Sequence, residues 1–147
     1  MRWPNALPDC STDLMYAGHF ALVMTLVGII VNPDAGLGGK LGFKGSDGRA
    51  EQARREGAVD RSGPRMAETF QRYIEIANED VEFVTCEGRM GSNWLSNYGG
   101  KISIIDGAEP STFRDTKSAV EKMTDMGIDL LLYSGGDGTT RDIISAL

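Results

Sequence analysis

The sequence is poor in the residues that build metal clusters, disulfide frameworks and polyanion-binding surfaces. Its 147 residues include two cysteines and one histidine, too few to indicate a disulfide framework or a zinc cluster. Fifteen Lys and Arg stand against 21 Asp and Glu, giving a net charge of −6, which argues against a nucleic-acid-binding surface. We therefore expect no nucleic-acid partner and a cytoplasmic location. Any phosphate site should be built from backbone N–H groups, helix ends or a metal ion.

The composition is that of a folded single domain. Hydrophobic residues make up 41% of the chain, with 19 glycines in addition, a share typical of globular proteins.

The uncharged run from Leu14 to Val31 is close to the shortest length of a membrane span. His19 interrupts that run and acidic residues precede it, so we do not expect a membrane protein. A strand pattern begins just after Met24, which predicts a folded domain over 24–147 and an unstructured extension, or a mis-assigned start, over 1–23.

Strand and helix patterns alternate along the rest of the chain. Apolar runs predict strands over 26–31, 81–86, 101–105 and 128–133. Helical spacing predicts a helix beginning near Pro64 and another from Thr112 to Gly127, and a further helix from Arg141. We expect a surface helix or loop without notable chemistry over 49–63 and a helical piece over 90–98. Strands separated by helices pair in parallel, so we predict an α/β fold: a Rossmann-like open parallel sheet with helices on both faces, in three layers.

Two glycine-rich segments follow the first and the last predicted strand. The first opens as Asn32-Pro33-Asp34-Ala35-Gly36-Leu37-Gly38-Gly39, and the second is Gly135-Gly136-Asp137-Gly138-Thr139. In an open parallel sheet, ligands bind beyond the carboxyl ends of the strands, and glycines let backbone N–H groups approach a phosphate closely. We predict that the two segments meet in space and hold a triphosphate through main-chain amides.

Neither segment has the Walker A pattern or the Gly-x-Gly-x-x-Gly dinucleotide pattern with its following acid. The second segment resembles the Gly-Gly-Asp-Gly-Thr/Ser mark shared by NAD kinases, diacylglycerol and sphingoid-base kinases and, more distantly, 6-phosphofructokinases. Together with the first segment and with Leu41-Gly42-x-Lys44-Gly45-x-Asp47-Gly48, it is similar to the archaeal-type ATP-NAD kinase branch, which includes acetoin-catabolism X-like proteins. The resemblance covers about residues 24–147.

The resemblance implies transfer of the γ-phosphoryl group of ATP to the 2′-hydroxyl of NAD, with Mg²⁺ shared by the phosphates. It also implies a second, mostly β domain after this one, so we interpret the chain as the truncated N-terminal part of such a protein. Asp137 is the expected catalytic residue, as an acceptor for the attacking hydroxyl. The expected nucleotide- and phosphate-binding residues are Asn32, Pro33, Gly36, Gly38, Gly39, Lys44, Gly135, Gly136, Gly138, Thr139 and Thr140.

Several alternatives stay open at this point. Asn32 could brace its loop or contact phosphate, and Thr139 could cap a helix or donate to phosphate. The chain could be a non-catalytic nucleotide-binding or regulatory module, or a lipid or sugar kinase with the same glycine motif. The partners expected are small-molecule nucleotides. The phosphoryl donor, the choice between NAD and NADH, and homo-oligomerisation are undetermined.

Overall fold

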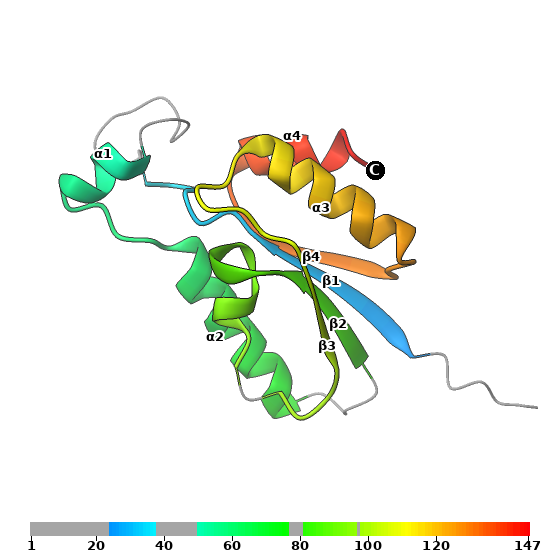
Figure 1. Ribbon diagram of the computed structural model, residues 1–147. Helices are drawn as coiled ribbons and strands as arrows, with labels where there is room; N and C mark the ends of the chain where they lie inside the picture. Colours follow the sequence, from blue (N-terminus) through cyan, green and yellow to red (C-terminus); the bar gives the residue numbers. More distant parts are fainter. Residues whose placement is uncertain (1–23, 38–49, 77–80, 97) are drawn as a thin grey trace, which may run out of the picture.

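The computed structural model describes residues 24–37, 50–76, 81–96 and 98–147 (Figure 1). Their centre is a four-stranded sheet made of β1 (Thr25–Val31), β2 (Val81–Cys86), β3 (Ile102–Ile105) and β4 (Leu130–Ser134). All strand pairs are parallel, and the order across the sheet is β3-β2-β1-β4. This confirms the predicted Rossmann-like open parallel sheet.

The order of the strands creates a switch point between β1 and β4. From β1 the chain steps outward to β2 and then to β3, and it next crosses back to place β4 on the other side of β1. The connections leaving β1 and β4 therefore diverge at the carboxyl edge of the sheet, and such a divergence is where open α/β sheets bind ligands. Figure 1 shows β1 between β2 and β4.

Helices cover both faces of the sheet, as predicted. On one face, α2 (Ser62–Ile76) places Met66 and Phe70 against Val27, Ile29 and Val31 of β1. On the other face, α3 (Phe113–Asp125) and α4 (Asp137–Ile144) lie side by side (Figure 1). β1 is central, so its successive side chains enter the two cores in turn.

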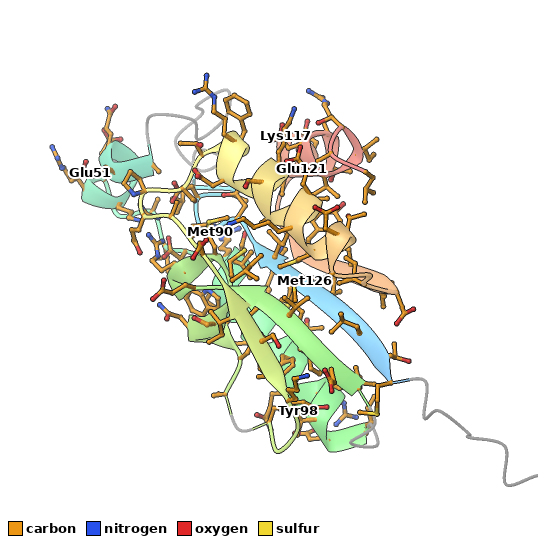
Figure 2. All side chains as sticks on the ribbon, turned by 45° about the vertical axis from the view of Figure 1, so that its right-hand side comes forward. Glu51, Met90, Tyr98, Lys117, Glu121 and Met126 are labelled. Carbon is orange, nitrogen blue, oxygen red and sulfur yellow. The ribbon has the colours of Figure 1, made fainter. Side chains whose placement is uncertain are left out.

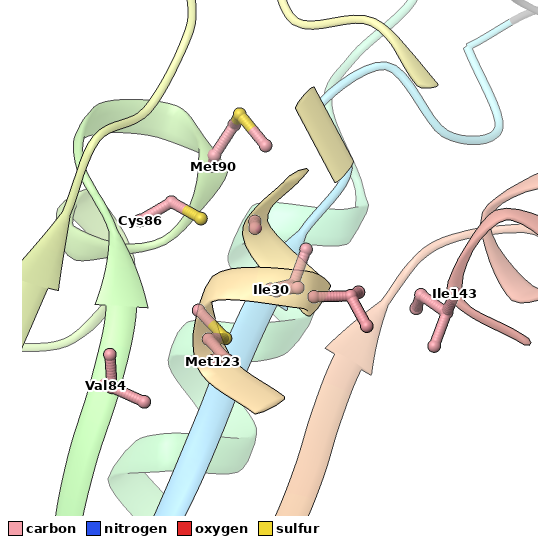
Figure 3. Packing of buried hydrophobic residues seen from close by; sticks show 8 residues of the cluster. Ile30, Val84, Cys86, Met90, Met123 and Ile143 are labelled. Atoms are coloured by element: carbon pink, nitrogen blue, oxygen red, sulfur yellow. The ribbon is translucent and has the colours of Figure 1, made fainter. Parts of the chain in front are cut away.

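The core on the face of the sheet covered by α3 and α4 is formed by side chains of the strands and of both helices. Ile30 and Val84 come from the sheet, and Met123 and Ile143 come from the two helices (Figure 3). Cys86 belongs to this cluster, and burial raises the pKa of its thiol to about 11, so the thiol is neutral at physiological pH. Figure 2 places Met90 and Tyr98 at opposite ends of the sheet, Met90 toward the carboxyl edge.

Local sequence explains the ends of α3. Thr112 is the N-cap, and its hydroxyl and N–H each lie 2.7 Å from a carboxylate oxygen of Asp115, which completes a capping box. The helix ends two residues before Gly127, whose φ of +79° is the left-handed conformation that glycine adopts most readily. Both ends agree with the sequence prediction.

Other predicted boundaries were wrong or imprecise. The third and fourth strands begin one and two residues later than predicted, and α2 begins two residues before Pro64. The helical piece expected over 90–98 consists of two short 3₁₀ helices, η2 (Gly88–Met90) and η3 (Ser92–Trp94). Residues 50–55 form α1 (Ala50–Arg55), whose Ala50 and Ala53 pack on Leu37. Residues 1–23, including most of the uncharged run, lie outside the described residues. Among the described residues, no helix has the length and apolarity to span a membrane.

Candidate functional site

The segments that follow β1 and β4 lie against each other at the carboxyl edge of the sheet. Val31 pairs with Ser134 across the two strands, and the N–H of Asn32 donates to the carbonyl oxygen of Ser134 at 2.8 Å. A second contact joins the two segments beyond the ends of the strands. Nδ2 of Asn32 donates to Oγ1 of Thr139 at 2.9 Å. The prediction that the two segments meet in space is confirmed.

Asn32 holds the junction through both ends of its side-chain amide. While Nδ2 contacts Thr139, Oδ1 accepts from the N–H of Asp34 at 3.0 Å, which closes a local turn after the strand. Pro33, the middle residue of this turn, is buried, and Gly36, two residues after the turn, is exposed with a φ of +79°. The bracing role weighed for Asn32 is therefore present in the fold; phosphate contact by Asn32, Pro33 or Gly36 stays a prediction.

Helix α4 begins inside the second glycine segment, four residues earlier than the predicted start at Arg141. Its N-cap is Gly136 and its first residue is Asp137. Thr140, directly after the segment, donates its N–H back along the chain to the carbonyl of Gly136 at 3.0 Å, which is the first such bond of the helix. The N–H groups of residues 137–139 precede this first helical bond, so the helix geometry leaves them directed outward, with the positive end of the helix dipole.

The three glycines of this segment have different surroundings. A Cβ atom at Gly135 would lie 2.6 Å from the side chain of Thr139, so packing within the chain requires glycine there. A Cβ atom at Gly136 or Gly138 would meet none of the described atoms within 4 Å. Neither of these two residues has a positive φ, so neither backbone strain nor packing explains them. The outer face of the segment is open for the close approach of a ligand.

Asp137 projects from the first turn of α4 into solvent. Its side chain is 90% exposed, and the contact recorded for its carboxylate is with Nη2 of Arg141, at 3.2 Å and one turn further along the helix. An exposed ion pair of this kind contributes little to stability. The carboxylate is therefore accessible to a bound molecule, at the end of a helix that favours negative charge.

The hydroxyls of Thr139, at the end of the segment, and of Thr140, directly after it, both have hydrogen-bond partners within the chain. Thr139 is buried, and its hydroxyl accepts from Asn32; it lies within the first turn of α4, so the suggested role as a helix cap was wrong, since Gly136 is the cap. The hydroxyl of Thr140 lies 2.8 Å from that of Tyr133 and 3.1 Å from the carbonyl oxygen of Gly136. Phosphate contact through either hydroxyl stays a prediction.

Comparison with known families now identifies the chain. Residues 27–147 match the model of the ATP-NAD kinase N-terminal domain. The chain belongs to this family. A search of curated proteins and a search of solved structures each find no match.

This ATP-NAD kinase N-terminal domain carries two arginines near the site that the sequence analysis did not single out. Arg54 of α1 contacts the carboxylate of Asp34 directly, and its Nε lies 3.3 Å from Asp60. Arg89 of η2 donates to Asp60 at 2.6 Å and to Glu109 at 3.0 Å. Residues 49–63 are thus not without notable chemistry, contrary to expectation. Only the mixture of acids and bases in that stretch could have hinted at ion pairs.

The pKa of Arg89 reflects its position between two acids. Partial burial acts against the charged form, but hydrogen bonds to Glu109 and Asp60, and their negative charges, outweigh it and raise the pKa above its ordinary value. Arg89 is therefore charged at every physiological pH.

Three predicted site residues of the domain, Gly38, Gly39 and Lys44, lie outside the described residues. The described residues contain no group of three or more His, Cys, Asp and Glu side chains arranged to hold a metal ion. Because Mg²⁺ in nucleotide sites is commonly bound by one or two carboxylates together with substrate phosphates, a preformed cluster is not required for it. At the second glycine segment, the exposed carboxylate of Asp137 is accessible for such binding.

Proposed function

We propose that this chain binds the phosphates of ATP at the junction of β1 and β4, as part of an enzyme that transfers the γ-phosphoryl group to the 2′-hydroxyl of NAD. Membership of the ATP-NAD kinase family supports the general activity. The observation that carries the specific proposal is the Asn32–Thr139 contact of 2.9 Å, because it joins the two glycine segments into one surface. We place the chain in the archaeal-type branch on the motifs of both segments.

The open face of the second segment supports phosphate binding by the main chain. Gly136 and Gly138 carry no side chain that would block approach, and the outward N–H groups of the first turn of α4 lie between and beside them. A chain with a net charge of −6 attracts a polyanion poorly through its overall field. Backbone N–H groups and the helix dipole supply positive potential locally without adding cations.

Asp137 is proposed to hold the attacking hydroxyl. The hydroxyl donates a hydrogen bond to the carboxylate, which orients its oxygen toward the γ-phosphorus. As the new O–P bond forms and the bond to the ADP oxygen breaks, the hydroxyl proton passes to the carboxylate. Because the transition state of phosphoryl transfer is loose, proton transfer comes late and a weak base suffices.

The residues at this edge fit a magnesium ion of the kind that nucleotides bring with them. Asp137 provides an exposed oxygen ligand beside the proposed phosphate surface, and Mg²⁺ prefers oxygen ligands and retains several waters. Bound there, Mg²⁺ would neutralise part of the phosphate charge. As an alternative to accepting the proton, Asp137 would hold it through a water molecule.

Titration calorimetry and a coupled assay test the proposal. We expect ATP to bind to the purified chain, and NADP to form when NAD and Mg²⁺ are added to the intact enzyme that contains this domain. Binding of ATP without NADP formation would favour the non-catalytic module. Phosphorylation of a lipid or sugar hydroxyl instead of NAD would favour the other kinase class.

Substitution of Asp137 tests the catalytic assignment. In the intact enzyme, Asp137→Asn should lower the rate of NADP formation by at least about 10²-fold while ATP affinity is retained, since a positioned acid–base group is lost. The same substitution also breaks the contact with Arg141, so Arg141→Gln is the matched control and should keep nearly the full rate. An equal loss in both variants, or none in Asp137→Asn, would refute the assigned role.

A further inference from the structure

A continuous series of polar contacts extends along the carboxyl edge of the sheet from the proposed site. It starts where Asn32 contacts Thr139 and Asp34, and it continues through two arginines that each join two carboxylates. We call this series the polar belt. After Asp34 its members are, in spatial order, Arg54, Asp60, Arg89 and Glu109.

The ionic contacts of the belt all lie within hydrogen-bond distance. Arg54 contacts Asp34 through Nη2 and reaches Asp60 Oδ1 from Nε at 3.3 Å. Arg89 donates from Nη2 to the other oxygen of Asp60 at 2.6 Å and from Nη1 to Glu109 at 3.0 Å. Asp60 thus joins the two guanidinium groups, so that each member of the belt contacts the next.

The order of the belt follows the order of the strands. Thr139 follows β4, Asn32 follows β1, Arg89 follows β2 and Glu109 follows β3. The belt therefore ties together the segments that leave all four strands at the edge where the glycine segments lie. Arg54 in α1 and Asp60 in the α1–α2 connection bridge the segments that follow β1 and β2.

Burial and charge indicate what the arginines do. The side chains of Asp34, Arg54, Asp60 and Arg89 are 19%, 31%, 26% and 23% exposed, so water screens these pairs only in part. Each guanidinium already lies between two carboxylates. Direct binding of phosphate that drew Arg54 away from Asp34, or Arg89 away from Asp60, would leave a partly buried carboxylate with fewer partners, which is unfavourable.

We infer that Arg54 and Arg89 are positioning residues, which act on the nucleotide site through Asp34 and Asn32 without touching the nucleotide. This inference rests on the proposed function for its ligand. The belt holds the turn after β1 at a fixed distance from the first turn of α4. The phosphate surface is thereby assembled before the nucleotide arrives, and less ordering remains to oppose binding.

Asp60→Asn tests the belt far from the ligand, because Asp60 touches neither glycine segment in the described structure. We expect ATP affinity, measured by calorimetry, to fall about 2- to 30-fold, the range for mutations that act through a contact network. In the ligand-free chain, amide hydrogen exchange should accelerate at Asn32 and Thr140, whose N–H groups bond to Ser134 and Gly136. Exchange in the middle of β2 should stay unchanged.

Arg89→Lys provides a second, milder variant, since lysine keeps the charge but does not bridge two carboxylates in a fixed plane. It should move affinity and exchange in the same direction as Asp60→Asn. The matched control is Arg55→Gln. Arg55 is next to Arg54 on α1 but pairs with Glu51, outside the belt, so neither measurement should change.

Three results would overturn the inference. Wild-type affinity and exchange in both variants would show that the belt has no effect on the site. Faster exchange throughout the sheet would show a loss of global stability rather than of positioning. Weaker ATP binding with unchanged exchange at Asn32 and Thr140 would show direct contact with the ligand. If the unaltered chain binds no ATP, the proposed function fails, and local exchange alone supports or overturns the belt.

Discussion

At the scale of single residues, two glycines of the second segment have different explanations: one is packing within the chain, and the other is the proposed ligand. Gly135 is required by the chain itself, because a Cβ atom there would lie 2.6 Å from the Thr139 side chain. Gly138 meets no such obstacle in the described structure, and its φ is not positive. Stability therefore explains the first glycine, whereas the proposed ligand explains the second.

Alanine substitutions at these two glycines should have opposite consequences. Gly135→Ala should lower the free energy of unfolding by about 1–3 kcal/mol, as expected for overpacking. Gly138→Ala should leave it unchanged or raise it by up to about 1 kcal/mol, since alanine favours the helix, and should weaken ATP binding. Urea unfolding and calorimetry measure the two effects. Wild-type ATP affinity in Gly138→Ala would contradict the proposed phosphate surface.

At the scale of elements, α3 shows how a local signal fixes a helix start. The hydrogen bonds from the hydroxyl and N–H of Thr112 lower the pKa of Asp115 below its ordinary value of 3.8. The folded state thus binds this proton more weakly than the unfolded state does. The stabilisation is fully present above the ordinary value and is lost as the pH falls through the lower, folded-state pKa.

Asp115→Asn should therefore destabilise the fold in a pH-dependent way. At neutral pH the loss should be about 0.5–1 kcal/mol, in the range of capping interactions. The difference from the unaltered chain should shrink as the pH is lowered below 3.8. Urea unfolding at a series of pH values measures it.

Asp125→Asn, in the last turn of the same helix, is the control for this series. Removing a negative charge there should not destabilise, since the helix dipole disfavours it. A constant difference between Asp115→Asn and the unaltered chain at every pH would count against the capping carboxylate.

At the scale of the whole molecule, the sheet divides the interior into two separate cores. Phe70 and Phe83 belong to the core under α2, with ring centroids 5.2 Å apart. Val120 belongs to the core under α3 and α4. Both cores depend on β1, which contributes side chains to each face. Among the described residues, the two cores have no hydrophobic side chain in common.

Substitutions in different cores should therefore act independently. Val120→Ala and Phe70→Leu should each cost about 1–3 kcal/mol, and their effects should add to within about 0.5 kcal/mol in the double variant. Phe70→Leu combined with Phe83→Leu is the comparison within one core, and it should deviate from additivity by more. Equal deviations in both double variants, measured by urea unfolding, would contradict the division.

Much of the fold follows from patterns that are local in the sequence. Apolar runs indicate the four strands, helical spacing indicates α2 and α3, and Gly127 marks the end of α3. The start of α4 was missed because glycine and threonine favour helices weakly. In the fold, α4 begins at Asp137, and Thr139 and Ile143 are buried along it.

The sequence by itself determined the elements, the parallel sheet and the two glycine segments at its carboxyl edge, because side-chain periodicity and turn residues act over a few positions. Only the tertiary structure decided that β4 lies beside β1 and brings Thr139 to Asn32, 107 positions away. It also decided the polar belt, whose Arg54–Asp34 and Arg89–Asp60 contacts span 20 and 29 positions. Such contacts depend on where each crossover places its strand, which no local pattern encodes.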